Sequence, residues 1–297
     1  MPKIEDSSGE LIRQRYSCRT YGDRPIDPAT REALSKHLAS LSAGPFASQT
    51  RFSLLAATED DRTSLKGLGT YGTIKGAPGF IVGAAQPGPR DLEDYGFCME
   101  RAVLAATGLG LQTCWLGGSF TKSSFARKIG ASRDEIVPAV VAVGYPVDGS
   151  REHWIRERAG GDGRLPHDRL FFEGTPDQPL PMSTGGEWAN ALEAVRWAPS
   201  ASNKQPWRLV RSGPTWRFYL ERTKGYGKGT LTFALMRMAD LQRVDMGIAM
   251  CHFDLVTRER GLVGRWVIEQ PVPGGDRPHL EYTASWIAEH TQAEVDG

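Results

Sequence analysis

The stretch most suited to chemistry is Ala198-Pro199-Ser200-Ala201-Ser202-Asn203-Lys204-Gln205-Pro206-Trp207, in which two prolines enclose short polar side chains. Proline fixes φ and biases the preceding residue away from helix, while Ser and Asn bond locally to backbone groups and favour turns. The sequence therefore predicts a stiff helix-to-strand turn that presents amide and hydroxyl groups. Such groups suit a flat heterocycle with C=O and N–H edges, although an ordinary connecting loop has the same composition.

A second candidate is Arg15-Tyr16-Ser17-Cys18-Arg19 near the N-terminus. In an extended segment alternate side chains point the same way, so two guanidinium groups and one hydroxyl would share a face. These are the groups that bind a phosphate. Alternating arginines are also common on a solvated edge strand, so the motif alone leaves both interpretations open.

Backbone access is the third chemical feature. Gly117 and Gly118 follow an apolar run that ends at Leu116, and two glycines after a buried strand let a ligand approach the main chain closely. A simple turn is the alternative. The basic, glycine-rich segment 151–169 reads as a solvated loop from which one or two arginines could reach an anion.

Several classes of protein are disfavoured by composition. The formal net charge of +1 gives no argument for nucleic acid or an acidic membrane surface, and no apolar run approaches the roughly 18 residues that span a bilayer. The polar N-terminus lacks a signal-peptide core, so a cytoplasmic location is expected. The four cysteines and six histidines have no metal-site spacing, so neither a metal nor a disulfide is expected.

The elements that must position these groups alternate between helix and strand. Apolar periodicity and capping residues predict helices over 11–15, 28–43, 91–107, 122–129, 187–197 and 233–260. Strands are predicted over 53–58, 80–85, 111–116, 137–143, 208–211, 216–221, 265–268 and 280–285. Segments 65–76 and 223–230 are expected to be loops, and the Pro-, Gly-, Ser- and Thr-rich segment 173–186 a linker.

The two parts on either side of that linker, residues 1–172 and 187–297, echo each other. Each runs helix, turn, strand, strand, long buried helix, glycine cap, strand, and Asp94-Tyr95-Gly96 in the first parallels Asp245-Met246-Gly247 in the second. The predicted fold is α+β, with two related halves facing each other across a pseudo-twofold axis and central buried helices.

These pieces together resemble the nitroreductase family of FMN-dependent oxidoreductases, in particular its single-chain branch (TM nitroreductase-like proteins), in which two half-like subunits are fused into a pseudo-dimer. Arg15 to Arg19 is similar to the family's Arg-x-Ser-x-Arg/Lys motif, and Pro199 to Trp207 to its Pro-Ser-x-x-Asn-x-Gln-Pro-Trp turn. Gly108 to Gly118 is similar to its Gly-Leu-Gly-x-x-x-Cys-Trp-x-Gly strand. Gly163-Arg164 resembles the basic tail, with glycine where a lysine is common.

The order of the motifs departs from the usual one. The turn expected soon after the first motif is degenerate at Ala43 to Thr50, and the intact copy lies in the second half, which has no Arg-x-Ser-x-Arg. In the family's homodimers each flavin takes this turn from the partner subunit. The resemblance therefore implies one complete FMN site per chain, with its pieces divided between the halves, and a monomeric pseudo-dimer.

The resemblance also implies roles. Arg15 and Ser17, with Tyr16 between them, would hold the FMN phosphate together with Arg164, and Arg19 would approach the pyrimidine edge. Leu116, Gly117 and Gly118 would lie beside N5, and the second half would contribute Pro199, Ser200, Ala201, Asn203 and Gln205.

The implied activity is hydride transfer from NAD(P)H to a nitroaromatic, quinone or other electron-poor acceptor by a ping-pong mechanism, with no catalytic side chain. Two alternatives stay open: a flavin-binding storage or sensor protein without turnover, and a dehalogenase-like or flavin-fragmenting enzyme on the same fold.

Overall fold

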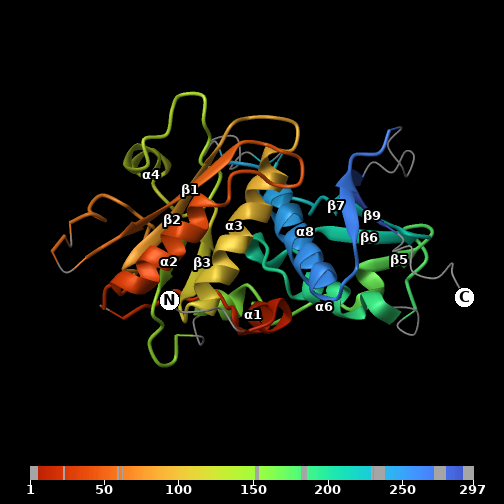
Figure 1. Cartoon of the computed structure of the whole chain (residues 1–297), viewed down its shortest axis with the longest axis horizontal. Helices are drawn as coiled ribbons and strands as arrows, with labels where there is room; N and C mark the ends of the chain where they lie inside the picture. The colour runs from red at the N-terminus through yellow and green to blue at the C-terminus, as the bar shows by residue number, and fades with distance from the viewer. Residues whose placement is uncertain are drawn as a thin grey trace, which may run out of the picture.

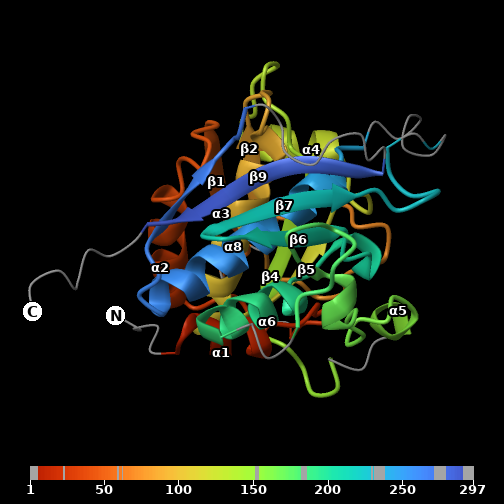
Figure 2. The same cartoon turned by 90° about the vertical axis from the view of Figure 1, so that its right-hand side faces the viewer.

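Two sheets stand at opposite ends of the molecule, and a pair of long helices lies between them (Figure 1). The computed structural model describes residues 6–22, 24–58, 60–61, 63–150, 154–181, 186–228, 230, 238–270 and 279–289. The turned view of Figure 2 places the second sheet in front of the long helices. The arrangement is that of an α+β protein built from two halves.

The first half contains a sheet in the order β1-β2-β4-β3, with every neighbouring pair antiparallel. Its strands are β1 (Thr50–Ala56), β2 (Gly79–Ala85), β3 (Gln112–Leu116) and β4 (Val140–Gly144). Its helices are α1 (Ser8–Gln14), α2 (Pro28–Ala39), α3 (Asp91–Gly108) and α4 (Lys122–Lys128). The central strands β2 and β4 are buried along their whole length, which explains their near-continuous apolar sequences.

The second half repeats this topology. Strands β6 (Trp207–Ser212), β7 (Thr215–Glu221), β8 (Gly264–Val267) and β9 (Leu280–Ala288) lie in the order β6-β7-β9-β8, again antiparallel. Helices α6 (Ala189–Trp197) and α8 (Leu241–Glu259) pack against each other. In both sheets the first two strands of the half are neighbours and the fourth lies between the second and the third. This shared order confirms that the halves are related.

One strand crosses from one half to the other. β5 (Phe171–Glu173) pairs in parallel with β6, so the end of the segment expected to complete the first half forms an edge of the second sheet. Its backbone follows a single 3₁₀ turn, η1 (His167–Arg169). The chain from about residue 160 to 173 therefore connects the halves. The division of the sequence into halves at residues 172 and 187 stays a prediction.

The pair α3 and α8 forms the centre of the molecule, and their contact is reciprocal. A Cβ atom on Gly96 would overlap the carbonyl oxygen of Val244, and one on Gly247 would overlap the carbonyl oxygen of Glu93. The two helices therefore approach until backbone touches backbone, at equivalent positions of the two halves. This symmetric contact places Gly96 and Gly247 beside the predicted pseudo-twofold axis.

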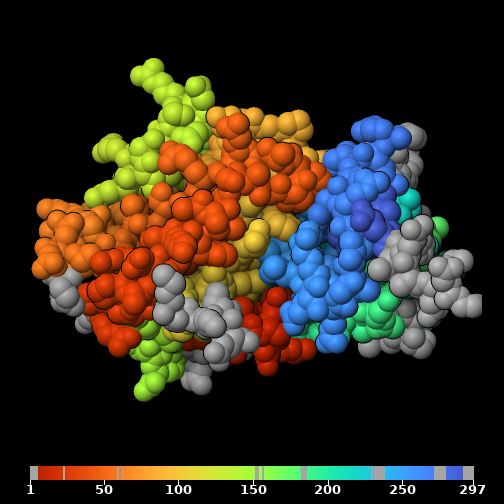
Figure 3. Space-filling model, in the orientation of Figure 1, coloured from red at the N-terminus to blue at the C-terminus, as the bar shows by residue number. Residues whose placement is uncertain are grey.

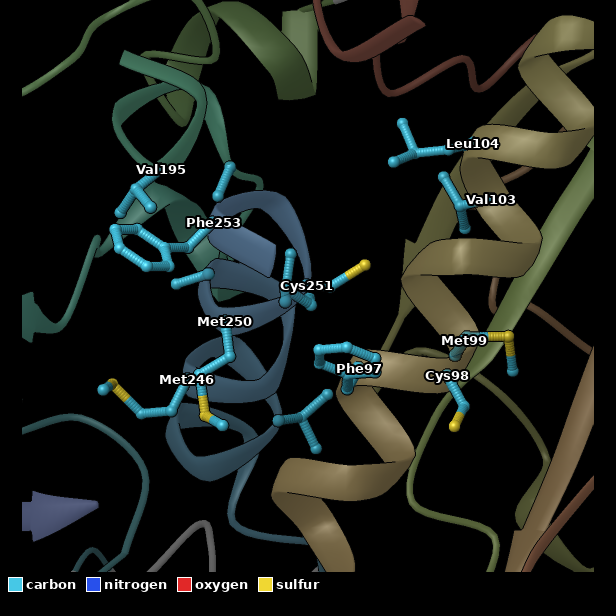
Figure 4. Packing of buried hydrophobic residues seen from close by; sticks show 14 of the residues in the cluster. Phe97, Cys98, Met99, Val103, Leu104, Val195, Met246, Met250, Cys251 and Phe253 are labelled. Atoms are coloured by element: carbon cyan, nitrogen blue, oxygen red, sulfur yellow. The ribbon is translucent and has the colours of Figure 1, made fainter. Parts of the chain in front are cut away.

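Apolar side chains fill the space around this crossing. In Figure 4, Phe97 points from α3 toward α8 and Cys251 points from α8 toward α3, while Phe253 meets Val195 of α6 on the other side. Farther out, Phe253 packs among Trp188, Trp216 and Trp286, with ring centroids 5.5–6.1 Å from its own. Figure 3 shows the first-half surface meeting that of α8, where α1 also lies against it through a hydrogen bond from the Ser8 amide to Glu259 (2.9 Å).

Most predicted elements are confirmed with small shifts of their ends, and the largest errors concern three segments. The helix predicted over 28–43 ends at Ala39. The helix predicted over 233–260 begins at Leu241, because Asp240 has φ −71° and ψ 86°, and residues 231–237 lie outside the described part. The segment expected to be a loop over 151–169 contains a short helix, α5 (Trp154–Arg158).

Two further boundaries differ slightly. The helix predicted over 187–197 is preceded by a 3₁₀ turn, η3 (Gly186–Trp188), which takes up the last residue of the predicted linker. Residues 182–185 of that linker lie outside the described part. The hairpin around Gly213 and Pro214 is confirmed by the pairing of β6 with β7.

We expect Gly96→Ala to lower the free energy of unfolding by about 3 kcal/mol, the upper end of the cost of overpacking, because the new methyl group meets a backbone atom that cannot rotate away. Urea titration would measure the change. Gly9→Ala in α1 is the matched control, since its Cβ would make only an ordinary contact with Ser7 Oγ (4.0 Å) and the stability should be unchanged or raised. Equal stability of the two variants would contradict the close approach.

Candidate functional site

A cavity of about 110 Å³ lies between the two halves and is lined by both. The first half contributes Ser17 and Arg19, Gly117 after β3, and the indole of Trp115. The second half contributes residues 199–202 together with Leu241, Val244, Asp245 and Ile248 of α8. Three of the stretches that sequence analysis singled out, far apart in the chain, therefore meet at one place.

The Arg15–Arg19 segment reaches this cavity as an added edge beside β3. Ser17 forms a parallel bridge to Thr113, the Cys18 amide donates to the Thr113 carbonyl (2.9 Å), and the Lys75 amide donates to the Arg19 carbonyl (2.8 Å). This pairing fixes an extended backbone, as predicted, and lets Ser17 and Arg19 line the cavity.

The first two residues of the motif point elsewhere. The Arg15 side chain is 5% exposed, and its Nε lies 3.9 Å from the Glu100 carboxylate. The hydroxyl of Tyr16 is 2.6 Å from the Ser150 hydroxyl. Neither side chain lines the cavity between the halves, so a contact of Arg15 or Tyr16 with a cofactor stays a prediction.

The Pro199–Trp207 turn has a strained conformation that hydrogen bonds hold in place, within the turn and to other parts of the chain. A 3₁₀ turn, η4 (Ala201–Asn203), occupies its centre, and Ser202, Asn203 and Gln205 have φ values of 50°, 54° and 49°. Left-handed backbone is unfavourable for residues with a Cβ and persists where surrounding contacts impose it. Here the Gln205 amide donates to Ser200 Oγ (2.8 Å), and the Ala201 amide donates to Asp245 Oδ1 (3.0 Å).

The amide side chains of this turn bind the chain that crosses between the halves. Asn203 donates to the carbonyls of Gly160 (2.6 Å) and Gly163 (2.9 Å), and Gln205, 4% exposed, accepts from the Leu165 amide (2.9 Å). Arg164 donates to Asn203 Oδ1 (3.3 Å) and lies over the Trp197 ring. Asn203, Gln205 and Arg164 are thus brought together one layer behind the cavity, and their contact with a cofactor stays a prediction.

The glycine pair opens toward a second, larger cavity. Gly117 and Gly118 line a chamber of about 710 Å³ together with Phe120, Lys122 and Met238. Side chains of the second half press on this backbone, since a Cβ on Gly118 would lie 2.8 Å from Met238 Cε and one on Gly117 would overlap Leu241. Leu116 itself is buried, so only the backbone after it is presented to the chamber.

The family model described as "Putative TM nitroreductase" matches residues 9–257, which is most of the chain. The chain belongs to this nitroreductase family. No curated protein matches it.

One of the matching solved structures shares the fold over nearly the whole chain. A crystal structure of a "putative nitroreductase" from Thermotoga maritima is 20% identical, covers 95% of this chain and 94% of its own, and has a TM-score of 0.59. A nitroreductase family protein from Clostridium difficile (19% identity, 53% of this chain and 92% of its own, TM-score 0.41) also matches. So does an FMN-bound nitroreductase from Bacteroides fragilis (22% identity, 48% of this chain and 90% of its own, TM-score 0.39).

The cavity between the halves combines a cation, Arg19, with a buried acid, Asp245. Arg19 Nε is buried and has no hydrogen-bond partner among the described residues, although its Nη1 donates to the Ser17 carbonyl (3.3 Å). Burial raises the pKa of Asp245 well above its usual range, although the hydrogen bond from Ala201 opposes that shift. Burial also raises the pKa values of the Cys18 and Cys114 thiols, which disfavours reactive thiolates beside the cavity.

Sequence analysis missed a buried polar network behind the site. Glu100 of α3 accepts from the Trp115 indole (2.9 Å) and lies 3.0 Å from His252 Nε2 of α8, while His252 Nδ1 lies 2.8 Å from the Ala194 carbonyl. Glu100 and His252 are fully buried. Glu100 itself could have predicted this network, because it lies in a largely apolar stretch of the helix and a glutamate is rarely buried without partners. The network joins both halves and orients Trp115, which lines the cavity.

The part of the chain that the structure describes shows no metal site, disulfide or membrane-spanning helix. No group of three or more metal-ligating side chains occurs there, and the four cysteines are buried and free. Among the same residues, no helix is long and apolar enough to cross a bilayer.

We expect Glu100→Ala to lower the free energy of unfolding by about 3–5 kcal/mol, because it leaves the indole N–H of Trp115 and the buried Nε2 of His252 without their carboxylate partner. Urea titration would measure the loss. Glu289→Ala removes the exposed ion pair with Arg265 (51% and 62% exposed) and should change stability by less than about 1 kcal/mol. A similar, small effect of both variants would show that the buried network contributes nothing.

Proposed function

We propose that this nitroreductase-family chain binds one FMN in the cavity between its halves and transfers hydride equivalents from NAD(P)H to an electron-poor acceptor such as a nitroaromatic or a quinone. The observation that carries the proposal is the meeting of Ser17 and Arg19, Gly117, and the Pro199–Ser202 turn around one cavity. These are the pieces that the family resemblance assigns to a single flavin.

The residues present fit an isoalloxazine ring and its surroundings. Arg19 offers a buried guanidinium N–H that has no partner among the described residues, which suits a carbonyl or ring nitrogen at the pyrimidine edge. Ser17 and Ser200 supply hydroxyl groups, and glycine backbone at 117 allows a flat ring to approach closely.

The space also fits a ring and a second planar molecule. The cavity of about 110 Å³ would hold only part of the ring, and it shares Gly117 with the chamber of about 710 Å³. It shares Leu241 with a further cavity of about 270 Å³. The larger chamber alone falls within the range of cofactor and substrate pockets, about 300–1,000 Å³, and the three spaces together slightly exceed it. We assign the larger chamber to the nicotinamide donor and the acceptor, which would enter in turn as ping-pong kinetics require.

FMN, when bound, supplies the exchange of a hydride or of single electrons between donor and acceptor. The protein's part is to bind, orient and tune. The guanidinium of Arg19 stabilises negative charge at the pyrimidine edge and so favours the reduced form. The stiff turn keeps Ser200 and Ala201 fixed while molecules exchange in the chamber. No side chain is needed as an acid or base, because water can supply protons at the chamber.

The visible spectrum of the purified chain, before and after anaerobic NADPH or NADH, tests the proposal. We expect flavin bands that bleach on addition of at least one nucleotide. Bands that persist with both nucleotides would favour the alternative of a flavin-binding protein without turnover. A colourless protein that takes up no added FMN would overturn the proposed site.

We expect Arg19→Ala to weaken FMN binding by about 1.5–3 kcal/mol, the value of a hydrogen bond to a charged group. Fluorescence titration of the flavin-free chain with FMN would measure this. Arg265→Ala, which removes an exposed guanidinium of the second sheet, is the charge-matched control and should leave the dissociation constant unchanged. An unaltered affinity in Arg19→Ala would remove Arg19 from the site.

We expect Asn203→Ala to lose flavin as well, although Asn203 is far from Arg15 in sequence. The substitution breaks the hydrogen bonds to the Gly160 and Gly163 carbonyls and releases Arg164 from the turn. The flavin content of the purified variant is the readout, and Asn190→Ala on α6 is the control. Full retention of flavin by Asn203→Ala would contradict a site shared between the halves.

A further inference from the structure

Each half has an aspartate at the equivalent position of its long helix, Asp94 and Asp245, and the two carboxylates make different hydrogen bonds. In the first half, Asp94 accepts the Phe46 amide at Oδ1 (3.0 Å) and the Ser48 amide at Oδ2 (2.8 Å), so the degenerate turn occupies both oxygens. In the second half, Asp245 accepts the Ala201 amide at Oδ1 (3.0 Å). Its Oδ2 is buried and has no partner within the described residues.

The unused oxygen belongs to a residue that faces the shared cavity. Asp245 is 3% exposed and lines the cavity with Ser17, Arg19 and the Pro199–Ser202 turn. A buried carboxylate oxygen without a donor destabilises the protein, because the hydration that it loses on burial is not replaced by a hydrogen bond. Where a cavity adjoins such an oxygen, a ligand N–H is the group that would relieve this cost.

The chemistry of the ring identifies that donor. The oxidised isoalloxazine ring carries several acceptors along its pyrimidine edge and a single N–H donor, at N3. The other polar groups that line the cavity offer N–H and O–H donors, from the Arg19 guanidinium and the hydroxyls of Ser17, Ser200 and Ser202. Among the residues that the structure describes, Asp245 is the one carboxylate in this lining.

We propose that Asp245 Oδ2 accepts a hydrogen bond from N3–H of the flavin, so that this one side chain fixes the turn through Oδ1 and the ring through Oδ2. The inference rests on the proposed function and names a contact within the same site. It explains why the intact turn leaves one oxygen of Asp245 unused while the degenerate turn uses both oxygens of Asp94. A donor at Oδ2 favours the charged carboxylate and opposes the rise in pKa that burial causes.

The experiment compares FMN with its N3-methyl analogue, which lacks the N–H and keeps both carbonyls. Dissociation constants for both ligands are measured by fluorescence titration of the flavin-free full chain, for the wild type, Asp245→Asn and Asp94→Asn. Asp245→Asn keeps an oxygen for the Ala201 amide and can replace Oδ2 by an NH₂ group of nearly the same size. Asp94→Asn makes the same change at the equivalent position away from the shared cavity.

We expect the wild type to prefer FMN over the N3-methyl analogue by roughly tenfold to a hundredfold, the range for a hydrogen bond to a charged acceptor. In Asp245→Asn this preference should fall to less than about threefold. The NH₂ group cannot accept a hydrogen bond from N3–H, so FMN and its N3-methyl analogue should bind with similar affinity. Asp94→Asn should keep the wild-type preference even where it lowers thermal stability.

Equal binding of both ligands by the wild type would overturn the contact, and this result does not depend on any variant folding. An undiminished preference in Asp245→Asn would overturn it too, because the discrimination would then arise from shape alone. Failure of the wild type to bind FMN at all would instead refute the proposed function, so the two failures are distinguishable.

Discussion

The close crossing of α3 and α8 is the constraint on which the rest of the structure depends. Backbone contact at Gly96 and Gly247 brings the helices together until no side chain fits between them at that point. Three of the features described above lie along this pair: Asp94 and Asp245 near the N-terminal ends of the helices, the glycines next, and the Glu100–His252 contact farther on. A larger residue at either glycine would separate the halves and therefore widen the cavity between them.

Because the halves are joined in one chain, each can specialise. In a symmetric pair of identical subunits, a residue that completes one site is present at the other as well. Here the first half keeps the Arg-x-Ser-x-Arg edge and the second keeps the strained turn, and these two pieces meet on one side of α3 and α8. On the opposite side the residues 43–50 fold back onto Asp94, and both carboxylate oxygens serve the fold. The same scaffold position thus lines a cavity in one half and binds a loop with both carboxylate oxygens in the other.

The sequence was sufficient for the repeat, because its signals are local. Three signals can be recognised without knowing what each element packs against. They are the buried helices with an Asp and a Gly at matching positions, the strands bounded by Gly and Pro, and the glycine that ends α8 (Gly261, φ 74°). The sequence did not predict that α2 ends at Ala39 or that α8 begins at Leu241, because apolar residues continue after Ala39 and also precede Leu241. The cross-over of β5 onto the second sheet depends on a tertiary pairing that no local pattern specifies.

The same distinction applies to the candidate site. Residue type and spacing were enough to select Ser17, Arg19, Gly117 and the Pro199–Ala201 turn, which line the cavity. They did not separate these from Arg15, Asn203 and Gln205, whose polar groups are directed to Glu100 or to the segment 160–165. Arg15 has extended backbone angles (φ −64°, ψ 131°), but its side chain is directed to the buried carboxylate of Glu100 rather than into the cavity.

Strain in the turn shows how the fold and the site depend on each other. Three residues with a Cβ hold left-handed φ values within four positions, a conformation that is costly in isolation. The contacts that impose it come from α8 through Asp245 and from the crossing chain through Asn203 and Gln205. The turn therefore takes its conformation only when both halves are assembled. The cavity that the turn lines forms together with the interface between the halves. A ligand that fills this cavity contacts both halves at once and stabilises their association by the free energy of its binding.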